Sequence, residues 1–360
     1  MSRPSEFARN IQRLRNRIEN RLRRGFRKSG DGDYWLSRVR FLPSTLEYTG
    51  EFGFELVLFL PFVTWLSQVG LLANRKIKTY RGMTSFYQDL GHAGLIEKDI
   101  EREFVRPRER LPYLPIKDEH AFKASRRSAF MTFPDLRQAF QNDPLTAEFE
   151  LEIARKPLVI VHNKYTNEWR EGPVNHISTD TLSAMFSELT PHFTVVYIRH
   201  GIAGSSDTYV GDHNDILAFD DRKVLEAHPQ VHLFDDLFRD WMAVSATADI
   251  NRFKNILCSR CHRFITTQGG GAHHLAYFSG SLMIVLHRRG DEELGAYTDG
   301  FYSFISNPAP LLACCRTEEE LMSAVPVILG SKTIGGRIVV EPTQSDVLER
   351  LSPWTLAGRT

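Results

Sequence analysis

The sequence predicts an α/β fold whose second half is a doubly wound parallel sheet, and three observations predict it. The run PLVIVHNKY, which begins at Pro157, is β-branched and apolar, as expected for a strand buried on both faces. Strand-like and helix-like segments alternate after it. Among them lies the run Phe264–Leu286, FITTQGGGAHHLAYFSGSLMIVL, which is typical of a strand, a glycine-rich turn, a short helix and a second strand.

The elements expected in this half follow from the spacing of the apolar residues. After the first strand, we expect strands at Phe193–Ile198, Val231–Phe234, Arg263–Thr267 and Leu282–Leu286. We expect helices at Thr179–Leu189, Asp236–Val244, Ile250–Cys258, Gly271–Phe278 and Thr317–Leu329. Ligands of such sheets bind at the carboxyl ends of the strands, beside helix N-termini, so we expect the site there.

The length of 360 residues favours about two domains. We expect a basic tail at 1–30, a reduced N-terminal domain at 31–150, a C-terminal domain at 151–330, and a final segment, 331–360, that packs back on the N-terminal domain through the strand-like GRIVVE. The N-terminal domain is expected to hold a strand at Leu46–Gly50, a buried apolar helix from Phe54 to Leu72 and a strand at Ile77–Tyr80. Glu101–Asp143, charged and proline-bearing, is expected to form short helices and loops.

The net charge of +1 hides an asymmetry, because residues 1–28 carry +8 and the rest carries −7. Within this tail, arginines and apolar residues recur at helical spacing on complementary faces: Arg9, Arg13, Arg17, Arg21 and Arg24 against Phe7, Ile11, Leu14, Ile18 and Leu22. Such a tail either binds anionic lipid headgroups as an amphipathic helix or stays a solvated basic segment. No apolar run follows it, so we expect a cytoplasmic protein, with residues 1–28 as a peripheral contact on the inner face of the membrane. We expect no nucleic-acid partner, because no basic stripe interleaved with aromatics follows.

The cysteines and acidic pairs are expected to be structural, and no metal site is expected. Cys258, Cys261 and His262 spell C-x-x-C-H, but haem attachment needs export, and adjacent Cys314 and Cys315 are a poor second pair for zinc. Asp31-Gly32-Asp33 spells D-x-D without a preceding strand to hold two carboxylates on a metal. We interpret Asp220-Asp221 as a loop and Asp235-Asp236 as a helix cap.

The triplet Gly269, Gly270 and Gly271 lies between an expected strand and an expected helix, where free backbone amides would face an anion. It matches neither G-x-G-x-x-G nor the P-loop pattern. A tight turn without a ligand is the alternative. Because three glycines cost more backbone entropy than a plain turn requires, we favour the anion site.

The run ITTQGGGAHHLAYFSGSLMIVLH resembles the donor-binding element in the C-terminal domain of GT-B glycosyltransferases, especially heptosyltransferases. The layout of residues 156–330 agrees with that domain, although only this element is closely similar. The resemblance implies two Rossmann-like domains and a nucleotide sugar as the donor substrate, without a further cofactor. It places the donor pyrophosphate on Gln268 and the backbone of Gly269–Ala272, with His273 or His274 beside it and the other histidine of the pair in the core.

Basic side chains follow other expected strands and could supply countercharge for a diphosphate. His162, Asn163 and Lys164 follow the first strand, Arg199 and His200 close the second, and Arg288 follows the strand after the glycine turn. Ordinary polar loops are the alternative.

An inverting transfer needs a base for the acceptor hydroxyl, and the resemblance implies one from the N-terminal domain. Glu51, in the turn between an expected strand and the apolar helix, is the candidate, with Glu55 next. Alternatively, Glu51 is an acid favoured at a helix N-terminus.

The leading hypothesis is therefore a metal-independent, inverting glycosyltransferase that moves a sugar from a nucleotide sugar to a glycan or lipid-linked acceptor. A nucleotide-binding or scaffold protein without catalysis is the alternative from another class. A Rossmann oxidoreductase is weaker, because the dinucleotide fingerprint is missing.

Overall fold

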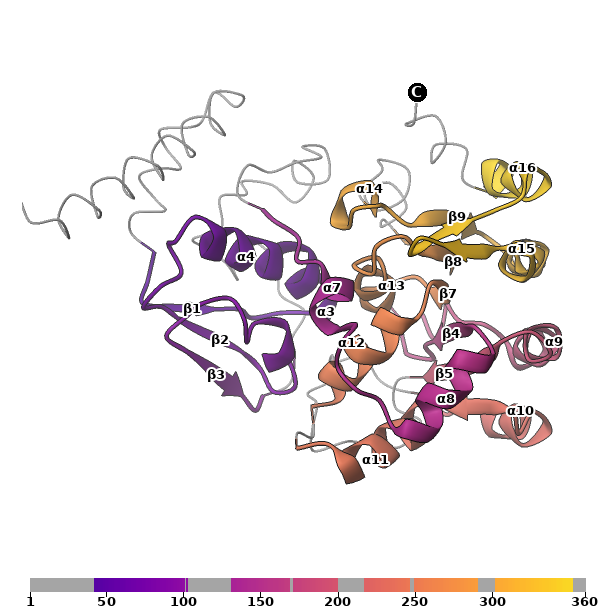
Figure 1. Ribbon diagram of the computed structural model, residues 1–360, viewed down its shortest axis with the longest axis horizontal. Helices are drawn as coiled ribbons and strands as arrows, with labels where there is room; N and C mark the ends of the chain where they lie inside the picture. The colour runs from indigo at the N-terminus through magenta and orange to yellow at the C-terminus, as the bar shows by residue number, and fades with distance from the viewer. Residues whose placement is uncertain are drawn as a thin grey trace, which may run out of the picture.

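The computed structural model describes residues 42–100, 102, 131–168, 171–199, 217–246, 249–290 and 302–351. The basic tail at 1–30 and the Asp31-Gly32-Asp33 triplet lie outside these ranges. Two parallel sheets organise the described residues, a three-stranded one and a six-stranded one (Figure 1).

The smaller sheet contains β1 (Thr45–Glu47), β2 (Lys76–Tyr80) and β3 (Gly94–Lys98), paired in that order and all parallel. One helical run connects β1 to β2: α3 (Phe52–Phe54), the π-helical turn η1 (Glu55–Phe59) and α4 (Leu60–Gln68). The short 3₁₀ helix η2 (Thr84–Phe86) lies between β2 and β3. We call the residues from β1 to β3 the N-terminal unit.

The apolar helix predicted for Phe54–Leu72 exists, but it begins earlier, contains a π-helical turn and ends at Gln68. Its end is set by Gly70, whose φ of 74° reverses the chain so that the amide of Leu71 donates to the carbonyl of Leu66 over 2.8 Å. Among the described residues, no helix has both the length and the apolar character that crossing a bilayer requires.

The larger sheet confirms the predicted doubly wound parallel sheet. Its strands are β4 (Leu158–Asn163), β5 (Thr194–Arg199), β6 (Val231–Leu233), β7 (Arg263–Thr267), β8 (Leu282–Leu286) and β9 (Leu311–Cys315). They run in the spatial order β6-β5-β4-β7-β8-β9, and every pair is parallel. The order reverses between β4 and β7, which are direct neighbours with Ile160 opposite Phe264.

Helices cover both faces of this sheet. They are α7 (Leu136–Phe140), α8 (Ala147–Arg155), α9 (Thr179–Leu189), α10 (Asp221–Ala227), α11 (Phe234–Val244), α12 (Ile250–Arg260), α13 (Gly270–Leu275), α14 (Tyr302–Ile305) and α15 (Glu318–Gly330). Several begin at the polar residues expected of N-caps: the side chains of Ser178, Asp249 and Thr317 accept bonds from amides of the first turn of α9, α12 and α15.

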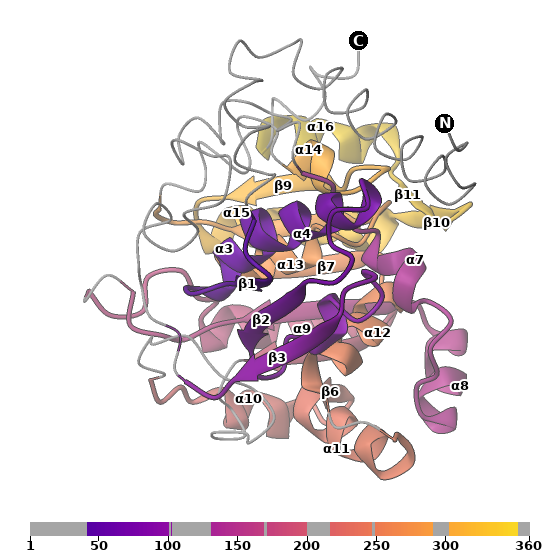
Figure 2. The same ribbon diagram turned by 90° about the vertical axis from the view of Figure 1, so that its left-hand side faces the viewer.

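The two faces have separate apolar cores. On one face, Val161, Leu182 and Val325 pack between the sheet and helices α9 and α15. On the other face, Val285 and Ile256 share one core with Leu46 and Leu56 of the N-terminal unit. Figure 2 shows this unit in front of the larger sheet. The two units therefore pack against each other through a continuous apolar core.

The described residues differ from the predicted domain division at two places. The boundary at residue 150 falls inside α8, and α7 packs against α12 of the larger sheet, where Arg137 donates to the carbonyl of Ser279 over 2.8 Å. The final segment was predicted to pack on the N-terminal domain. Its described part forms the hairpin β10 (Lys332–Ile334) and β11 (Arg337–Val339) and helix α16 (Pro342–Leu351), which packs on α15 and β9. Leu348 and Leu351 give α16 an apolar side that the core around α15 buries.

Candidate functional site

The reversal of strand order between β4 and β7 places the candidate site. In open α/β sheets, ligands bind beyond the carboxyl ends of the strands at such a reversal. Lys164 follows β4, and Gln268 and the glycine triplet follow β7. The structure thus brings together two of the sequence motifs predicted to form a site. His200, a third candidate, lies outside the described residues.

Lys164 joins the two loops. Its ammonium donates to Oε2 of Glu168 over 2.8 Å and to Oε1 of Gln268 over 3.0 Å. A β-carbon added to Gly269 would lie 3.2 Å from the same Nζ atom, so the ammonium rests on the glycine turn. Since an ammonium has three protons, one donor remains beyond these two bonds. Its side chain is 19% exposed and can therefore reach a bound anion.

Two fully buried asparagines hold the surrounding loops. Asn163 accepts from the amides of Lys164 and Ile177 over 3.0 and 2.9 Å. Asn175 accepts from the amide of Arg288 over 2.8 Å and donates to Glu168, which ties the loop after β4 to the loop after β8. Because each asparagine side chain forms hydrogen bonds through both its oxygen and its nitrogen, the loops around the site are held in fixed positions. No sequence pattern indicates Asn175, whereas Glu168 stands four residues after Lys164, a spacing that favours an ion pair.

Each position of the triplet requires glycine for a different steric reason. Gly269 has a φ of 124°, in the region that favours glycine. A β-carbon on Gly271 would lie 2.1 Å from Cε1 of His162, and one on Gly270 would lie 2.9 Å from the ring of Phe52 and 3.1 Å from the amide nitrogen of Gly53. The turn therefore needs glycine for its packing against β4 and α3, independently of any ligand.

Helix α13 begins at Gly270, so the amides of its first turn lack acceptors within the helix. The amide of Gly53, in the first turn of the helical run of the N-terminal unit, lies beside Gly270. The N-termini of two helical segments, each with a partial positive charge, thus lie side by side next to Lys164.

The histidines of α13 point in different directions. His274 is fully buried, and its Nε2 lies 2.6 Å from Oδ1 of Asn255, so the expectation that one of the pair belongs to the core is met by His274. Burial lowers its pKa well below the ordinary value for histidine, which keeps the ring neutral. His273 is partly exposed and contacts the hydroxyl of Tyr302 through Nδ1 at 2.9 Å. Only His273 remains a candidate ligand group. His162 is buried against Thr266 at 3.1 Å and serves the packing of the turn.

The basic side chains expected to supply countercharge for a diphosphate are already paired with carboxylates. All of the candidate cations that the structure describes lie at the carboxyl edge of the sheet, but each has a carboxylate partner. Arg199 forms a buried pair with Asp221, Arg288 lies 2.8 Å from Glu318, and Lys164 pairs with Glu168. Asp221, which the sequence placed in a loop, begins α10 and is fully buried. Arg199 is thus structural, and the site has balanced charge, with Lys164 nearest to the glycine turn.

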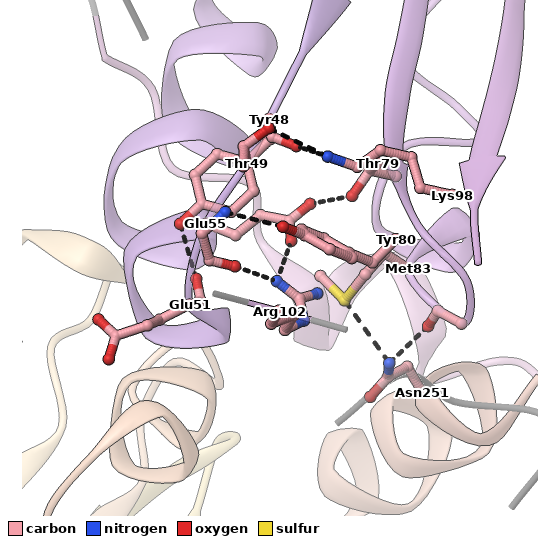
Figure 3. A network of polar contacts seen from close by, with 12 residues as sticks. Tyr48, Thr49, Glu51, Glu55, Thr79, Tyr80, Met83, Lys98, Arg102 and Asn251 are labelled. Carbon is pink, nitrogen blue, oxygen red and sulfur yellow. Dashed lines mark hydrogen bonds and ion pairs between the residues drawn. The ribbon is translucent and has the colours of Figure 1, made fainter. Parts of the chain in front are cut away.

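The two candidate bases have different environments. Glu55 is fully buried in η1, 2.8 Å from Arg102, and its carboxylate also accepts from Tyr87 and Thr79. It cannot contact an acceptor substrate in this position, so the assignment of Glu55 as a base is wrong. Glu51 precedes α3 as its N-cap residue and is half-buried, and its carboxylate points away from the Glu55–Arg102 pair (Figure 3). Glu51 is thus the candidate base that the N-terminal unit offers beside the glycine turn.

The cysteines are buried and reduced, in line with the structural role predicted for them. Burial raises the pKa of Cys261 and Cys314 to about 12, so both are thiols at neutral pH. Within the described ranges, no group of three His, Cys, Asp or Glu side chains is arranged to bind a metal ion.

Comparisons with protein-family models, with curated proteins and with solved structures found no match to this chain.

Proposed function

We propose that the protein is a glycosyltransferase of the GT-B kind, which binds a nucleotide sugar at the reversal between β4 and β7. One observation supports it above the others. The glycine turn after β7, Lys164 after β4 and the Glu51 turn of the N-terminal unit converge, with the backbone of Gly53 packed on that of Gly270. A donor-binding turn and a carboxylate from a second unit are the two parts that an inverting transfer requires.

The strand order also bears on the oxidoreductase alternative. Dinucleotide-binding sheets with this order carry their glycine-rich turn after the first strand of the sheet. Here the first strand is β4, which Lys164 and Tyr165 follow, and the glycine turn comes after the fourth, β7. This position of the glycine turn favours a nucleotide sugar over NAD as the ligand.

In the proposed reaction, the donor diphosphate lies on the amides of the glycine turn, and the ammonium of Lys164 stabilises the charge that develops on it. Glu51 removes the proton of an acceptor hydroxyl, whose oxygen attacks the anomeric carbon of the sugar. The bond from that carbon to the diphosphate breaks, and a nucleoside diphosphate leaves. The products are an inverted glycoside and a protonated Glu51, which returns its proton to solvent. No metal ion takes part in this proposal.

The acceptor proposed is a glycan or a lipid-linked sugar. The support is the charge of +8 on residues 1–28, which suits binding to anionic lipid at the inner face of a membrane. Removal of residues 1–28 should weaken sedimentation with phosphatidylglycerol vesicles while leaving donor binding unchanged.

The test of the function uses a panel of UDP-, GDP-, CMP- and ADP-sugars, with NAD as the comparison, in a thermal-shift assay. We expect a nucleotide sugar to raise the unfolding midpoint, and NAD to have no effect. In the presence of acceptor, Glu51→Gln should abolish transfer and retain donor binding. The control is Glu97→Gln, an exposed carboxylate on β3 of the same unit. Full activity of Glu51→Gln would remove Glu51 as the base, and stabilisation by NAD alone would replace the proposal.

A second candidate is a nucleotide-binding protein without catalysis. It is favoured by the close packing of Phe52 and Gly53 on Gly270, which leaves less room at the turn than a cleft that opens between two domains. The two candidates differ in the same assay: a binding protein would respond to the nucleotide and would transfer no sugar to any acceptor.

A further inference from the structure

A buried polar network lies directly behind the Glu51 turn (Figure 3). At its centre, Arg102 and Glu55 form an ion pair of 2.8 Å in which neither side chain is exposed. Tyr87 donates to the Glu55 carboxylate over 2.8 Å, and Thr79 of β2 donates to the same oxygen. Burial and the adjacent Glu55 raise the pKa of Tyr87 well above its ordinary value, so Tyr87 stays protonated as the donor.

The network holds the peptide groups of the turn on several sides. Arg102 donates to the carbonyl of Gly50 over 3.1 Å, and the amide of Gly50 donates to the hydroxyl of Tyr80 over 2.9 Å. The hydroxyl of Tyr48 donates to the carbonyl of Glu51 over 2.7 Å. The guanidinium of Arg102 also lies 4.1 Å from the centre of the Tyr80 ring, a cation–π contact. The backbone on both sides of the Glu51 side chain is therefore held, at Gly50 by Tyr80 of β2 and by Arg102, and at the Glu51 carbonyl by Tyr48.

Three features of this segment are unusual. A fully buried ion pair is often no more stable than an apolar pair of similar volume, because both charges lose their hydration. Glu55 stands in a π-helical turn, a conformation that is rare and frequent at functional sites. Gly50 has a φ of 141°. All three features lie around Glu51, which indicates that this segment is built to hold a particular backbone conformation.

We infer that Arg102 and Glu55 are positioning residues, which fix the Gly50–Glu51 backbone and thereby the place of the Glu51 carboxylate, one residue before the contact of Phe52 and Gly53 with Gly270. The role of Glu51 rests on the proposed function, whereas the fixing of the turn does not. Neither Arg102 nor Glu55 contacts substrate in this account, because both side chains are fully buried.

The test replaces both charges at once with apolar residues, as Glu55→Leu combined with Arg102→Met. Removal of one charge alone would leave the other buried without a partner and would strongly destabilise the protein. The double variant should stay folded but unfold below the wild-type midpoint, because the hydroxyls of Tyr87 and Thr79 lose their acceptor. Deuterium uptake at the Gly50 and Glu51 amides should become about tenfold faster, because the charge-assisted bond to the Gly50 carbonyl is lost. In the transfer assay, kcat should fall about tenfold or more, with the KM for the donor unchanged.

Two further variants are needed, one that removes a different bond to the turn and one that serves as a control. Tyr80→Phe removes the acceptor of the Gly50 amide but keeps the ring over Arg102, and it should also speed exchange at that amide and lower kcat. Arg81→Met is the matched control, because Arg81 pairs with Asp99 at 3.2 Å on the exposed side of the same unit. It should change neither exchange at the turn nor kcat.

The outcomes separate this inference from the proposed function. Unchanged exchange at Gly50 and Glu51 in the double variant and in Tyr80→Phe would overturn it, whether or not the protein is a transferase. Faster exchange with an unchanged kcat would overturn the link to catalysis. If the wild-type protein transfers no sugar from any donor, the proposed function fails, and the exchange rates alone decide whether the pair fixes the turn.

Discussion

Gly271→Ala tests the contact between the glycine turn and β4. The new β-carbon would lie 2.1 Å from Cε1 and 2.6 Å from Nδ1 of His162, whereas carbon atoms in contact normally lie about 3.5–4.0 Å apart. The His162 ring must move by more than an ångström, and it then loses its 3.1 Å contact with Thr266. Because His162 is only 8% exposed, close-packed neighbours oppose that movement.

The magnitude follows from three contributions. Overpacking costs about 1–3 kcal/mol, the lost hydrogen bond costs about 0.5–1.5 kcal/mol, and alanine in place of glycine in a helix offsets about 1 kcal/mol. We therefore expect a loss of about 0.5–3.5 kcal/mol in the free energy of unfolding, measured by urea denaturation followed by circular dichroism. Gly94→Ala on β3 is the control, because a β-carbon there meets no atom within 4 Å. It should change stability by less than about 0.5 kcal/mol.

A double-mutant cycle locates the clash. In the His162→Ala background the ring is gone, so Gly271→Ala should cost little or nothing further, which gives a coupling energy of about 0.5–3.5 kcal/mol. Equal stability of Gly271→Ala and Gly94→Ala, or additive losses in the cycle, would refute the packing described for the turn.

Three other predictions use the titrating and paired groups. Burial lowers the pKa of His287 from 6.5 to about 4, so the unfolded state binds its proton first as the pH falls. The contribution of His287 to the free energy of unfolding is complete above pH 6.5 and is lost between pH 6.5 and 4, by about 3 kcal/mol at most. In His287→Gln, the free energy of unfolding from urea denaturation should therefore change less over this pH range. Asp221→Asn should cost about 3–5 kcal/mol in thermal unfolding, because Arg199 stays buried without its partner, whereas its exposed neighbour variant Asp220→Asn should cost less than about 1 kcal/mol. A thiol reagent at pH 8 should label none of the four buried cysteines in the native protein and all of them after unfolding: Cys258, Cys261, Cys314 and Cys315. Rapid labelling of the native protein would contradict their burial.

Local patterns predict five of the six strands of the larger sheet. The predicted strands Arg263–Thr267 and Leu282–Leu286 have the same bounds in the structure, because both are buried on both faces and flanked by turn residues. Strands β3 and β9 were missed. β3, with the sequence GLIEK, is only partly buried and has no regular alternation, so its place beside β2 is set by tertiary packing.

The environment of the site residues was less predictable, because it depends on partners remote in sequence. Glu318 reaches Arg288 from α15, and Arg102 reaches Glu55 of η1 from the chain that follows β3. A single sequence shows that arginines follow strands, but not which carboxylates neutralise them. For the same reason, the burial of Glu55 could not be distinguished from the exposure expected of a base.

The most direct test of the central proposal is the affinity for the nucleotide sugar that the thermal-shift panel identifies, measured by calorimetry on wild type, Lys164→Met and Lys156→Met. Lys164 lies at the carboxyl end of β4, whereas Lys156 precedes its amino end and donates to the carbonyl of Thr190 over 3.1 Å. We expect Lys164→Met to weaken binding about tenfold or more and Lys156→Met to bind as the wild type does. No binding of any nucleotide sugar, or equal affinity of all three proteins, would contradict a donor site at the reversal between β4 and β7.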